Sequence, residues 1–139
     1  MRVLLDSDVV LDFVLEREPF VEAAGELLEL IAQGVCDGYI SGITPVNVFY
    51  LVRKAKGVDK ARQAIGDLLI AFQVCAITHT VLEDAFALPF ADYEDAVQHA
   101  SAAAIGLDAI VTRNLDDYKN ASLPVYSPTD FLNHLKAQS

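Results

Sequence analysis

Three acidic segments of this chain carry the residue types that bind divalent cations. The first is Asp6-Ser7-Asp8, the second runs from Asp92 through Glu94 to Asp95, and the third is residues 112–117. Clustered carboxylates repel one another unless they are protonated or bound to a cation. Hard cations such as Mg²⁺ prefer oxygen ligands, commonly carboxylates with water and a substrate phosphate. The segments therefore predict a metal-dependent site that hydrolyses or transfers a phosphoryl group.

A second interpretation of the same acids stays open. Asp8 and residues 92–95 precede or begin predicted helices, where negative side chains are favoured by the helix dipole. Asp116 and Asp117 would then lie in a solvated turn. The elements that position these acids decide whether they meet.

The acids fall where strands end or helices begin. Val3–Leu5 is a short apolar run that stops at Asp6, which is typical of the first strand of an α/β sheet. Similar runs predict strands at 36–41, 72–77, 109–111 and 124–126. Helical spacing predicts helices at 9–16, 20–33, 44–55, 59–71, 80–88, 93–105 and from 128, with Thr44 as an N-cap. This alternation indicates a parallel sheet covered on both faces, whose strand ends share one edge. The three segments are expected to converge there.

Composition restricts the class of protein. The chain has 139 residues, 53% of them hydrophobic, which excludes disorder and predicts one domain over residues 1–139. No transmembrane run or secretory signal is visible, and Cys36 and Cys75 lack metal-site spacing, so we expect reduced core thiols in the cytoplasm. The net charge of -10 disfavours non-specific binding to nucleic acid or membrane, but five of the ten basic residues lie within 53–62.

Three stretches of the chain resemble a known family. LLDSDVVLD, DYEDAVQHASAAAIGLDAIVTRNLDDY and LPVYSPTDFL are similar to the PIN domain, the ribonuclease fold of VapC-like toxins, in its branch with TRN-x-x-D-[FY]. The resemblance implies a three-layer α/β/α sandwich with a central, mostly parallel sheet. It also implies Mg²⁺- or Mn²⁺-dependent cleavage of RNA by a metal-activated water, a homodimer, and a separately encoded protein antitoxin.

The resemblance assigns site residues one by one. Asp6 matches the family's first metal-site acid, Asp95 the central acid, and Asp117 the acid of the D-[FY] pair. Asn114 stands where many members have Asp, and Thr112 matches the small hydroxyl residue before it. The resemblance thus implies that Asp6, Asp95 and Asp117 hold the metal ion.

Asn47 departs from the family pattern, which commonly has Glu at this place on the third helix. An amide coordinates through oxygen or binds a metal-bound water, but it supplies no charge. With Asn114 also neutral, three firm carboxylates remain. This leaves open an alternative function, a weakly active or inactive PIN-like module that binds RNA or protein.

Several neighbours of these acids have two possible roles. Ser7 either caps the first helix or contacts the scissile phosphate, and Asp8 either begins that helix or supports the metal site from outside. Arg113 either contacts phosphate or is structural. Tyr50 and Lys54 share a helical stripe with Asn47, so they either line an RNA path or form a half-buried helix face.

Two further side chains lie near Asp95 in the sequence, and one other enzyme class shares the first acidic motif. Glu94 and Asp95 are adjacent on a helix, so we expect only Asp95 to reach the ion. His99 lies one turn after Asp95 and is expected to pair with it. A phosphatase of the haloacid dehalogenase type also has D-x-D after a strand, but the glycine expected after the second Asp is missing here.

Overall fold

Five parallel strands form the centre of the fold. The computed structural model describes residues 1–138. The strands are β1 (Arg2–Leu5), β2 (Asp37–Ser41), β3 (Gln73–Cys75), β4 (Ala109–Val111) and β5 (Val125–Tyr126). They are arranged in the order β3-β2-β1-β4-β5, and every neighbouring pair is parallel. The predicted α/β class is confirmed, and the sheet is wholly rather than mostly parallel.

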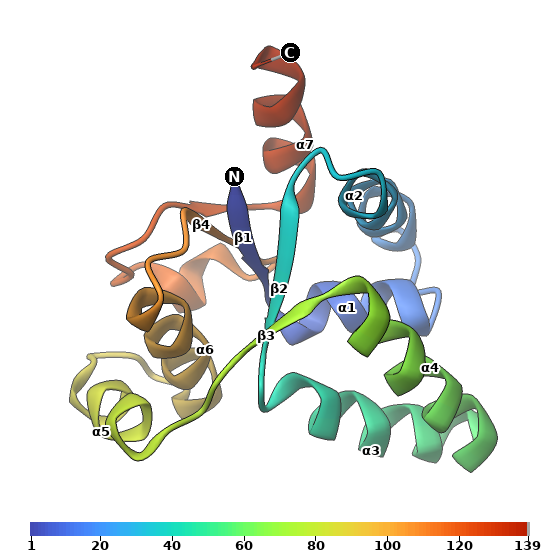
Figure 1. Ribbon diagram of the computed structural model, residues 1–139, viewed down its shortest axis with the longest axis horizontal. Coiled ribbons are helices and arrows are strands. Elements are labelled where there is room, and N and C mark those ends of the chain that lie inside the picture. The colour runs from blue at the N-terminus through green and yellow to red at the C-terminus, as the bar shows by residue number, and fades with distance from the viewer. Residues whose placement is uncertain (139) are drawn as a thin grey trace.

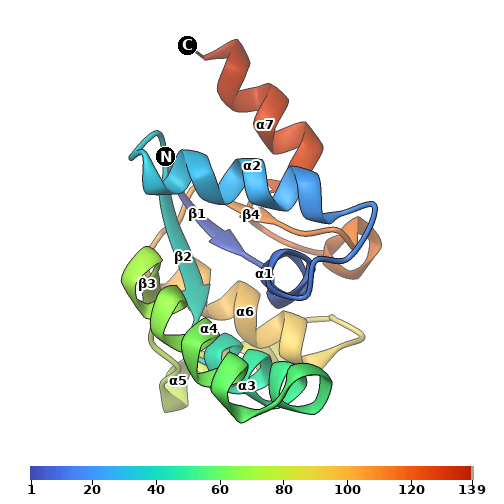
Figure 2. The ribbon, with the colours of Figure 1, turned by 90° about the vertical axis from the view of Figure 1, so that its right-hand side faces the viewer.

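Helices cover both faces of this sheet (Figures 1 and 2). They are α1 (Ser7–Val14), α2 (Val21–Ala32), α3 (Thr44–Lys56), α4 (Val58–Ala71), α5 (His79–Ala87), α6 (Tyr93–Ala104) and α7 (Pro128–Ala137), with a short 3₁₀ helix, η1, at Leu115–Tyr118. The core under α1, α2, α3, α4 and α7 is separate from the core under α5 and α6. The predicted three-layer α/β/α sandwich is therefore confirmed.

The central strand β1 shows why its sequence suits this position. Val3 and Leu5 face one core and Leu4 faces the other, and all three are fully buried. Continuous apolar runs of this kind are typical of parallel strands that are covered on both faces. β1 therefore presents Asp6, the residue after it, at the middle of the carboxyl edge.

The helix starts differ from the predicted caps at two places. Thr44 is the first residue of α3 rather than its cap, because Ile43 before it already has helical backbone angles (φ -80°, ψ -24°). At α1 the cap is Asp6, whose side chain accepts a hydrogen bond from the backbone N–H of Asp8. Ser7 is thus inside the helix, and the prediction that it caps α1 is wrong.

Both cysteines are buried free thiols, as predicted. Burial raises the pKa of Cys75 to about 11, which keeps its thiol protonated and unreactive. Within residues 1–138, none of the helices has both the length and the apolar character needed to cross a bilayer.

Candidate active site

Asp6 is the most constrained acid at the carboxyl edge of the sheet. Its side chain is only 4% exposed. It accepts hydrogen bonds from Thr112 Oγ1 (2.8 Å), Gln98 Nε2 (3.1 Å), Ser7 Oγ (3.3 Å) and the backbone N–H of Asp8 (3.4 Å). Three of these donors reach Oδ1 and only Thr112 reaches Oδ2. Oδ2 is therefore the less crowded oxygen of Asp6, although the Tyr118 side chain also hydrogen-bonds this carboxylate.

Ser7 joins this carboxylate to a second acid. Its hydroxyl lies 2.9 Å from Oε1 of Glu94, closer than the 3.3 Å to Oδ1 of Asp6. Glu94 belongs to the first turn of α6, so the contact ties α6 to the start of α1. Glu94 is therefore part of the site, although the adjacent-residue argument favoured Asp95 alone.

Asp95, also in the first turn of α6, is half-buried among other acids. Its pKa is raised to about 7, first by burial and then by the charges of Asp6, Asp92, Asp117 and Glu94. Each of these carboxylates thus lies within electrostatic reach of Asp95. The three predicted metal ligands are brought to one edge, as the strand order required.

η1 carries both Asp117 and the buried Tyr118, and Tyr118 holds η1 next to Asp95. Asp117 is exposed, whereas Tyr118 is 2% exposed and lies with its hydroxyl 3.5 Å from Oδ1 of Asp95. Burial, together with the charges of Asp6 and Asp95, raises the pKa of Tyr118, so its hydroxyl stays a donor. η1 is thereby fixed against the acid cluster.

Asn114 binds Asp8 rather than Asp6. Its Nδ2 donates to Oδ2 of Asp8 (2.8 Å), and its backbone N–H donates to Thr112 Oγ1 (3.1 Å). Burial and then the charge of Asp6 raise the pKa of Asp8 to about 7. Oδ1 of Asp8 is buried without a hydrogen-bond partner among the described residues. An unpaired buried carboxylate oxygen of this kind suits a cation nearby.

Arg113 has a structural role. The sequence had left open whether it is structural or contacts phosphate. Its guanidinium binds both oxygens of buried Asp12 (2.8 and 3.1 Å) and lies 4.2 Å from the centre of the Phe20 ring. Such a bidentate pair fixes the loop after β4 against α1. Arg113 is therefore already engaged, and its prediction as an RNA contact gains no support.

His99 does not pair with Asp95 as expected. Its Nε2 accepts a hydrogen bond from the backbone N–H of Ser122 (3.0 Å), and its ring lies against Phe90. Burial lowers the pKa of His99, which keeps the ring neutral. The predicted local Asp–His pair is wrong because the histidine faces the loop before β5.

α3 brings Asn47 and Tyr50 to a hollow of about 480 Å³ next to the acids. The hollow is lined by Ser7, Asp8, Leu11, Arg17, Val46, Asn47, Tyr50, Leu51 and Glu94. Asn47 and Tyr50 thus share a hollow with Asp8 and Glu94, an orientation that the helical stripe had left open. Lys54 is exposed one turn beyond Tyr50 and lies outside this lining.

Gln98 is the functional side chain that sequence reasoning missed most clearly. It is fully buried, donates to Asp6, and accepts a hydrogen bond from the backbone N–H of Ser7 at 3.2 Å. A signal was available, because Gln98 follows Glu94 by four residues and Asp95 by three, which places all three on one helix face. Asp12 and Arg17 left no comparable signal in the sequence.

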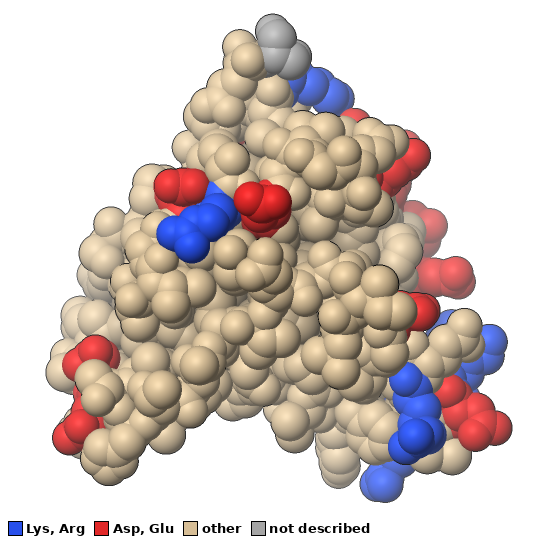
Figure 3. Space-filling view, viewed as in Figure 1, with Lys and Arg blue, Asp and Glu red and all other residues tan. Residues whose placement is uncertain are grey.

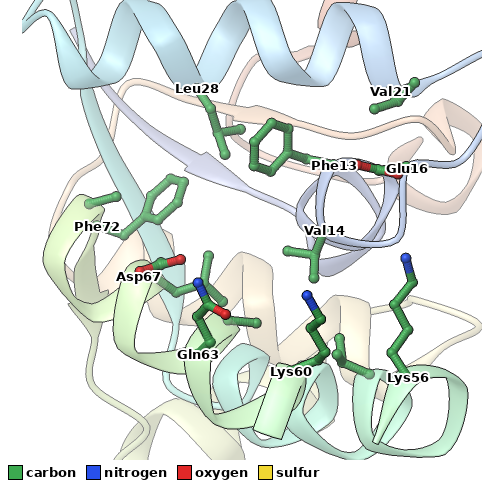
Figure 4. A pocket seen from close by; sticks show the side chains of 14 residues that line it. Phe13, Val14, Glu16, Val21, Leu28, Lys56, Lys60, Gln63, Asp67 and Phe72 are labelled. Atoms are coloured by element: carbon green, nitrogen blue, oxygen red, sulfur yellow. The ribbon is translucent and has the colours of Figure 1, made fainter.

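A second hollow, of about 450 Å³, lies away from the acid cluster (Figure 4). It opens between α1, α2 and α4, and Lys56 and Lys60 point from α3 and α4 toward α1 at its rim. Figure 3 shows Lys and Arg side chains gathered at this α3–α4 corner of the molecule. The basic window 53–62 is thus a single corner of the surface, separate from the acids.

The acids have the donor chemistry that a hard divalent cation requires. The pKa of Asp95 is raised first by burial and then by the charges of the neighbouring carboxylates, and a bound cation would offset that repulsion. Over residues 1–138, however, no three His, Cys, Asp or Glu side chains stand close enough together to hold an ion in their present positions. Asp117, one of the three predicted ligands, is exposed in this arrangement.

Comparison with known proteins identifies the family. The sequence model of the family described as PIN domain matches residues 2–116. This chain belongs to the PIN domain family. The match also decides against a phosphatase of the haloacid dehalogenase type. The D-x-D sequence after β1 is a similarity to that class in this short segment alone. Among curated proteins, none matches the chain.

Solved structures share the fold of this PIN domain. A chain of VapBC2 from Rickettsia felis, bound to a promoter DNA fragment, has a TM-score of 0.72 at 17% identity and covers 90% of this chain and 97% of that chain. A chain of a toxin–antitoxin complex from Klebsiella pneumoniae has a TM-score of 0.67 at 23% identity. The match covers 91% of this chain and 97% of that chain. VapC20 from Mycobacterium tuberculosis, a toxin that cleaves the sarcin–ricin loop, has a TM-score of 0.63 at 15% identity. The match covers 78% of this chain and 86% of that chain.

Proposed function

We propose that this PIN domain is a metal-dependent endoribonuclease, with Asp6, Asp95 and Asp117 as the ligands of Mg²⁺ or Mn²⁺. The observation that carries the proposal is the crowding of carboxylates around Asp95, whose pKa is about 7 instead of near 4. Perturbed acids at the carboxyl edge of a parallel sheet mark a functional site. Among metal-dependent reactions, we choose RNA hydrolysis because the chain belongs to the PIN domain family.

The chain's own residues prepare the site for catalysis. A bound divalent cation would supply an activated water and stabilise negative charge on the phosphodiester. Thr112 and Gln98 hold the Asp6 carboxylate in one orientation through hydrogen bonds of 2.8 and 3.1 Å. Asn114 holds Asp8 in the same way, so its proposed contribution to catalysis is to position that acid. These contacts leave Asp95 and Asp117 as the adjustable ligands.

The test combines metal removal with single substitutions. Cleavage of single-stranded RNA should stop in EDTA and return on addition of Mn²⁺. We expect Asp6→Asn, Asp95→Asn and Asp117→Asn each to lower cleavage and Mn²⁺ affinity by more than roughly 100-fold, since even indirect support of a metal site is worth 10- to 100-fold. Asp84→Asn, an exposed acid on α5, is the matched control. If Asp6→Asn cleaves as well as the wild type, the catalytic assignment is wrong.

A second candidate function is a PIN-like module that binds RNA or protein without cleaving it. Asn47 and Asn114 favour this function, because both amides stand where a carboxylate would add charge for a metal ion. The same assay separates the two functions. RNA binding without cleavage at saturating Mn²⁺ would establish the binding module and exclude the nuclease.

We further propose that the protein is the toxin of a toxin–antitoxin pair. Support comes from the PIN domain match and from folds shared with complexes of that kind. Expression of the chain alone should stop bacterial growth, and Asp6→Asn should relieve the arrest. A protein encoded beside it should bind the purified toxin and inhibit RNA cleavage. Growth arrest that Asp6→Asn does not relieve would contradict a nuclease toxin.

A homodimer is proposed from an exposed apolar face on α5. The Phe86 side chain is 84% exposed and Leu82 is 38% exposed beside it. Exposed apolar patches of this kind are typical of protein contacts. Sedimentation should show a dimer that Phe86→Glu converts to a monomer. Equal sedimentation of the two proteins would place any dimer contact elsewhere.

A further inference from the structure

The hollow between α1 and α3 combines groups of different chemistry around one space. Its volume is about 480 Å³, and Asp8 and Glu94 connect it to the acid cluster. Asn47 and Tyr50 come from the α3 wall. Arg17, which follows α1, is the one basic side chain among the described residues that line it. The hollow thus offers an aromatic ring, an amide and a cation at the margin of the acids.

The polar groups of the α3 wall have no partners within the chain. Across residues 1–138, neither the side-chain amide of Asn47 nor the hydroxyl of Tyr50 makes a hydrogen bond. The Tyr50 side chain is 60% exposed, and the guanidinium of Arg53 lies 5.9 Å from the centre of its ring. An exposed aromatic ring beside an arginine suits stacking on a nucleobase. The free amide supplies a donor and an acceptor for the edge of that base.

Arg17 forms only a long ion pair with Asp12, because Arg113 binds that carboxylate more closely. Arg113 binds both oxygens of Asp12 at 2.8 and 3.1 Å, whereas Arg17 Nη1 remains 3.7 Å from Oδ1, beyond hydrogen-bond distance. The Arg17 side chain is 40% exposed. Asp12 therefore orients Arg17 without occupying its donors, which match the geometry of a phosphate.

We propose that this hollow binds one nucleotide of the RNA beside the reacting phosphodiester. Tyr50 stacks on the base, Asn47 hydrogen-bonds its edge, and Arg17 contacts the flanking phosphate. The orientation follows from charge, since Asp8 and Glu94 repel phosphate from the acidic end and Arg17 attracts it at the other. The proposal rests on the proposed ribonuclease function, because the acid cluster defines which phosphate reacts.

The test measures base stacking at single nucleotide positions by fluorescence, and it does not require RNA cleavage. Short single-stranded RNAs carry the fluorescent base 2-aminopurine at successive positions, and binding is measured in EDTA. We expect quenching at one position. Tyr50→Ala should abolish it and weaken RNA binding roughly 5- to 100-fold, while Tyr50→Phe keeps both, because stacking needs only the ring. Ile70→Ala, which removes an 86% exposed side chain from α4, should change neither.

Arg17 is tested through the salt dependence of the same binding. Each phosphate contact contributes about 0.7 to the slope of log affinity against log salt for single strands. Arg17→Gln should lower that slope by about 0.7, whereas Lys136→Gln on α7, an equal change of charge outside the α3–α4 corner, should leave it unchanged. An unchanged slope for Arg17→Gln would remove Arg17 from the subsite.

The outcomes separate this proposal from the nuclease proposal. Position-specific quenching that depends on Tyr50, in a protein that never cleaves RNA, would support the subsite and overturn the nuclease. Cleavage that is unaffected by Tyr50→Ala, without position-specific quenching, would support the nuclease and overturn the subsite. If Ile70→Ala weakens binding as much as Tyr50→Ala, the hollow is not the place where RNA stacks.

Discussion

At the scale of single residues, the site depends on Gln98 as much as on the acids. We predict that Gln98→Met destabilises the fold by about 1–3 kcal/mol, because the backbone N–H of Ser7 loses its buried acceptor. Asp6 also loses a donor, so Mn²⁺ affinity should fall by roughly 10- to 100-fold. Urea unfolding and calorimetric titration measure the two effects. Gln63→Met, an exposed glutamine on α4, is the control, and equal losses in both variants would contradict this role.

Asp95 should make the stability of the metal-free protein depend on pH. Its pKa is near 4 when unfolded and about 7 when folded, so between these values the folded protein holds a proton that the unfolded chain has released. Stability should therefore fall as pH rises from about 4 to 7. Asp8, whose pKa is also about 7, adds to the same trend. The folded protein is destabilised at higher pH because it keeps these ionised acids partly buried and close together without a cation.

The measurement is the melting temperature from pH 5 to pH 8, with and without Mn²⁺. Asp95→Asn should flatten the fall with pH and should be more stable than the wild type at pH 8 without metal. Mn²⁺ should raise the melting temperature of the wild type at pH 8 and have little effect on Asp95→Asn. A wild-type stability that rises over this range would show that the acids do not repel as inferred.

At the scale of elements, one ion pair fastens α1 to the loop that carries Thr112 and Asn114. Asp12 on α1 is 1% exposed and is held by Arg113 from that loop. Arg113→Ala should destabilise the protein by about 2–3 kcal/mol, less than the 3–5 of a wholly buried pair, because Arg17 stays near Asp12. Arg17→Ala should cost under about 1 kcal/mol. Urea unfolding ranks the variants, and the reverse order would contradict the geometry.

The elements also show what the sequence could predict. Strand and helix positions were predictable, because β1 and β4 (Ala109–Val111) are apolar runs and helices such as α2 bury a regular stripe. The position of Asp6, Asp95 and Asp117 at one edge of the sheet then followed from parallel pairing, but their spacing did not. The true N-caps, Asp6 of α1 and Ile43 of α3, were not predictable, since a cap depends on the backbone angles of a single residue. Arg113 and Arg17 could not be told apart, because only the fold shows which one Asp12 binds.

At the scale of the whole molecule, charge is distributed very unevenly. The chain carries a net charge of -10, yet half of its basic residues lie in the window 53–62. That window is the α3–α4 corner in Figure 3, and α3 joins it to the hollow beside the acids. The net charge alone disfavours non-specific binding to nucleic acid, whereas the clustered basic residues of this corner offer a polyanion a favourable approach along α3.

This approach predicts an effect of position as well as of total charge. Lys54→Gln combined with Lys56→Gln should lower kcat/KM for RNA cleavage roughly 10-fold at low salt and much less at high salt, because electrostatic steering is screened by ions. Gln33→Glu combined with Gln73→Glu changes the net charge equally at the end of α2 and on β3, away from the α3–α4 corner, and should have a smaller effect. Stopped-flow cleavage at several salt concentrations compares the pairs. Equal losses would mean that RNA senses only the net charge, and Lys54 would then have no special part in binding.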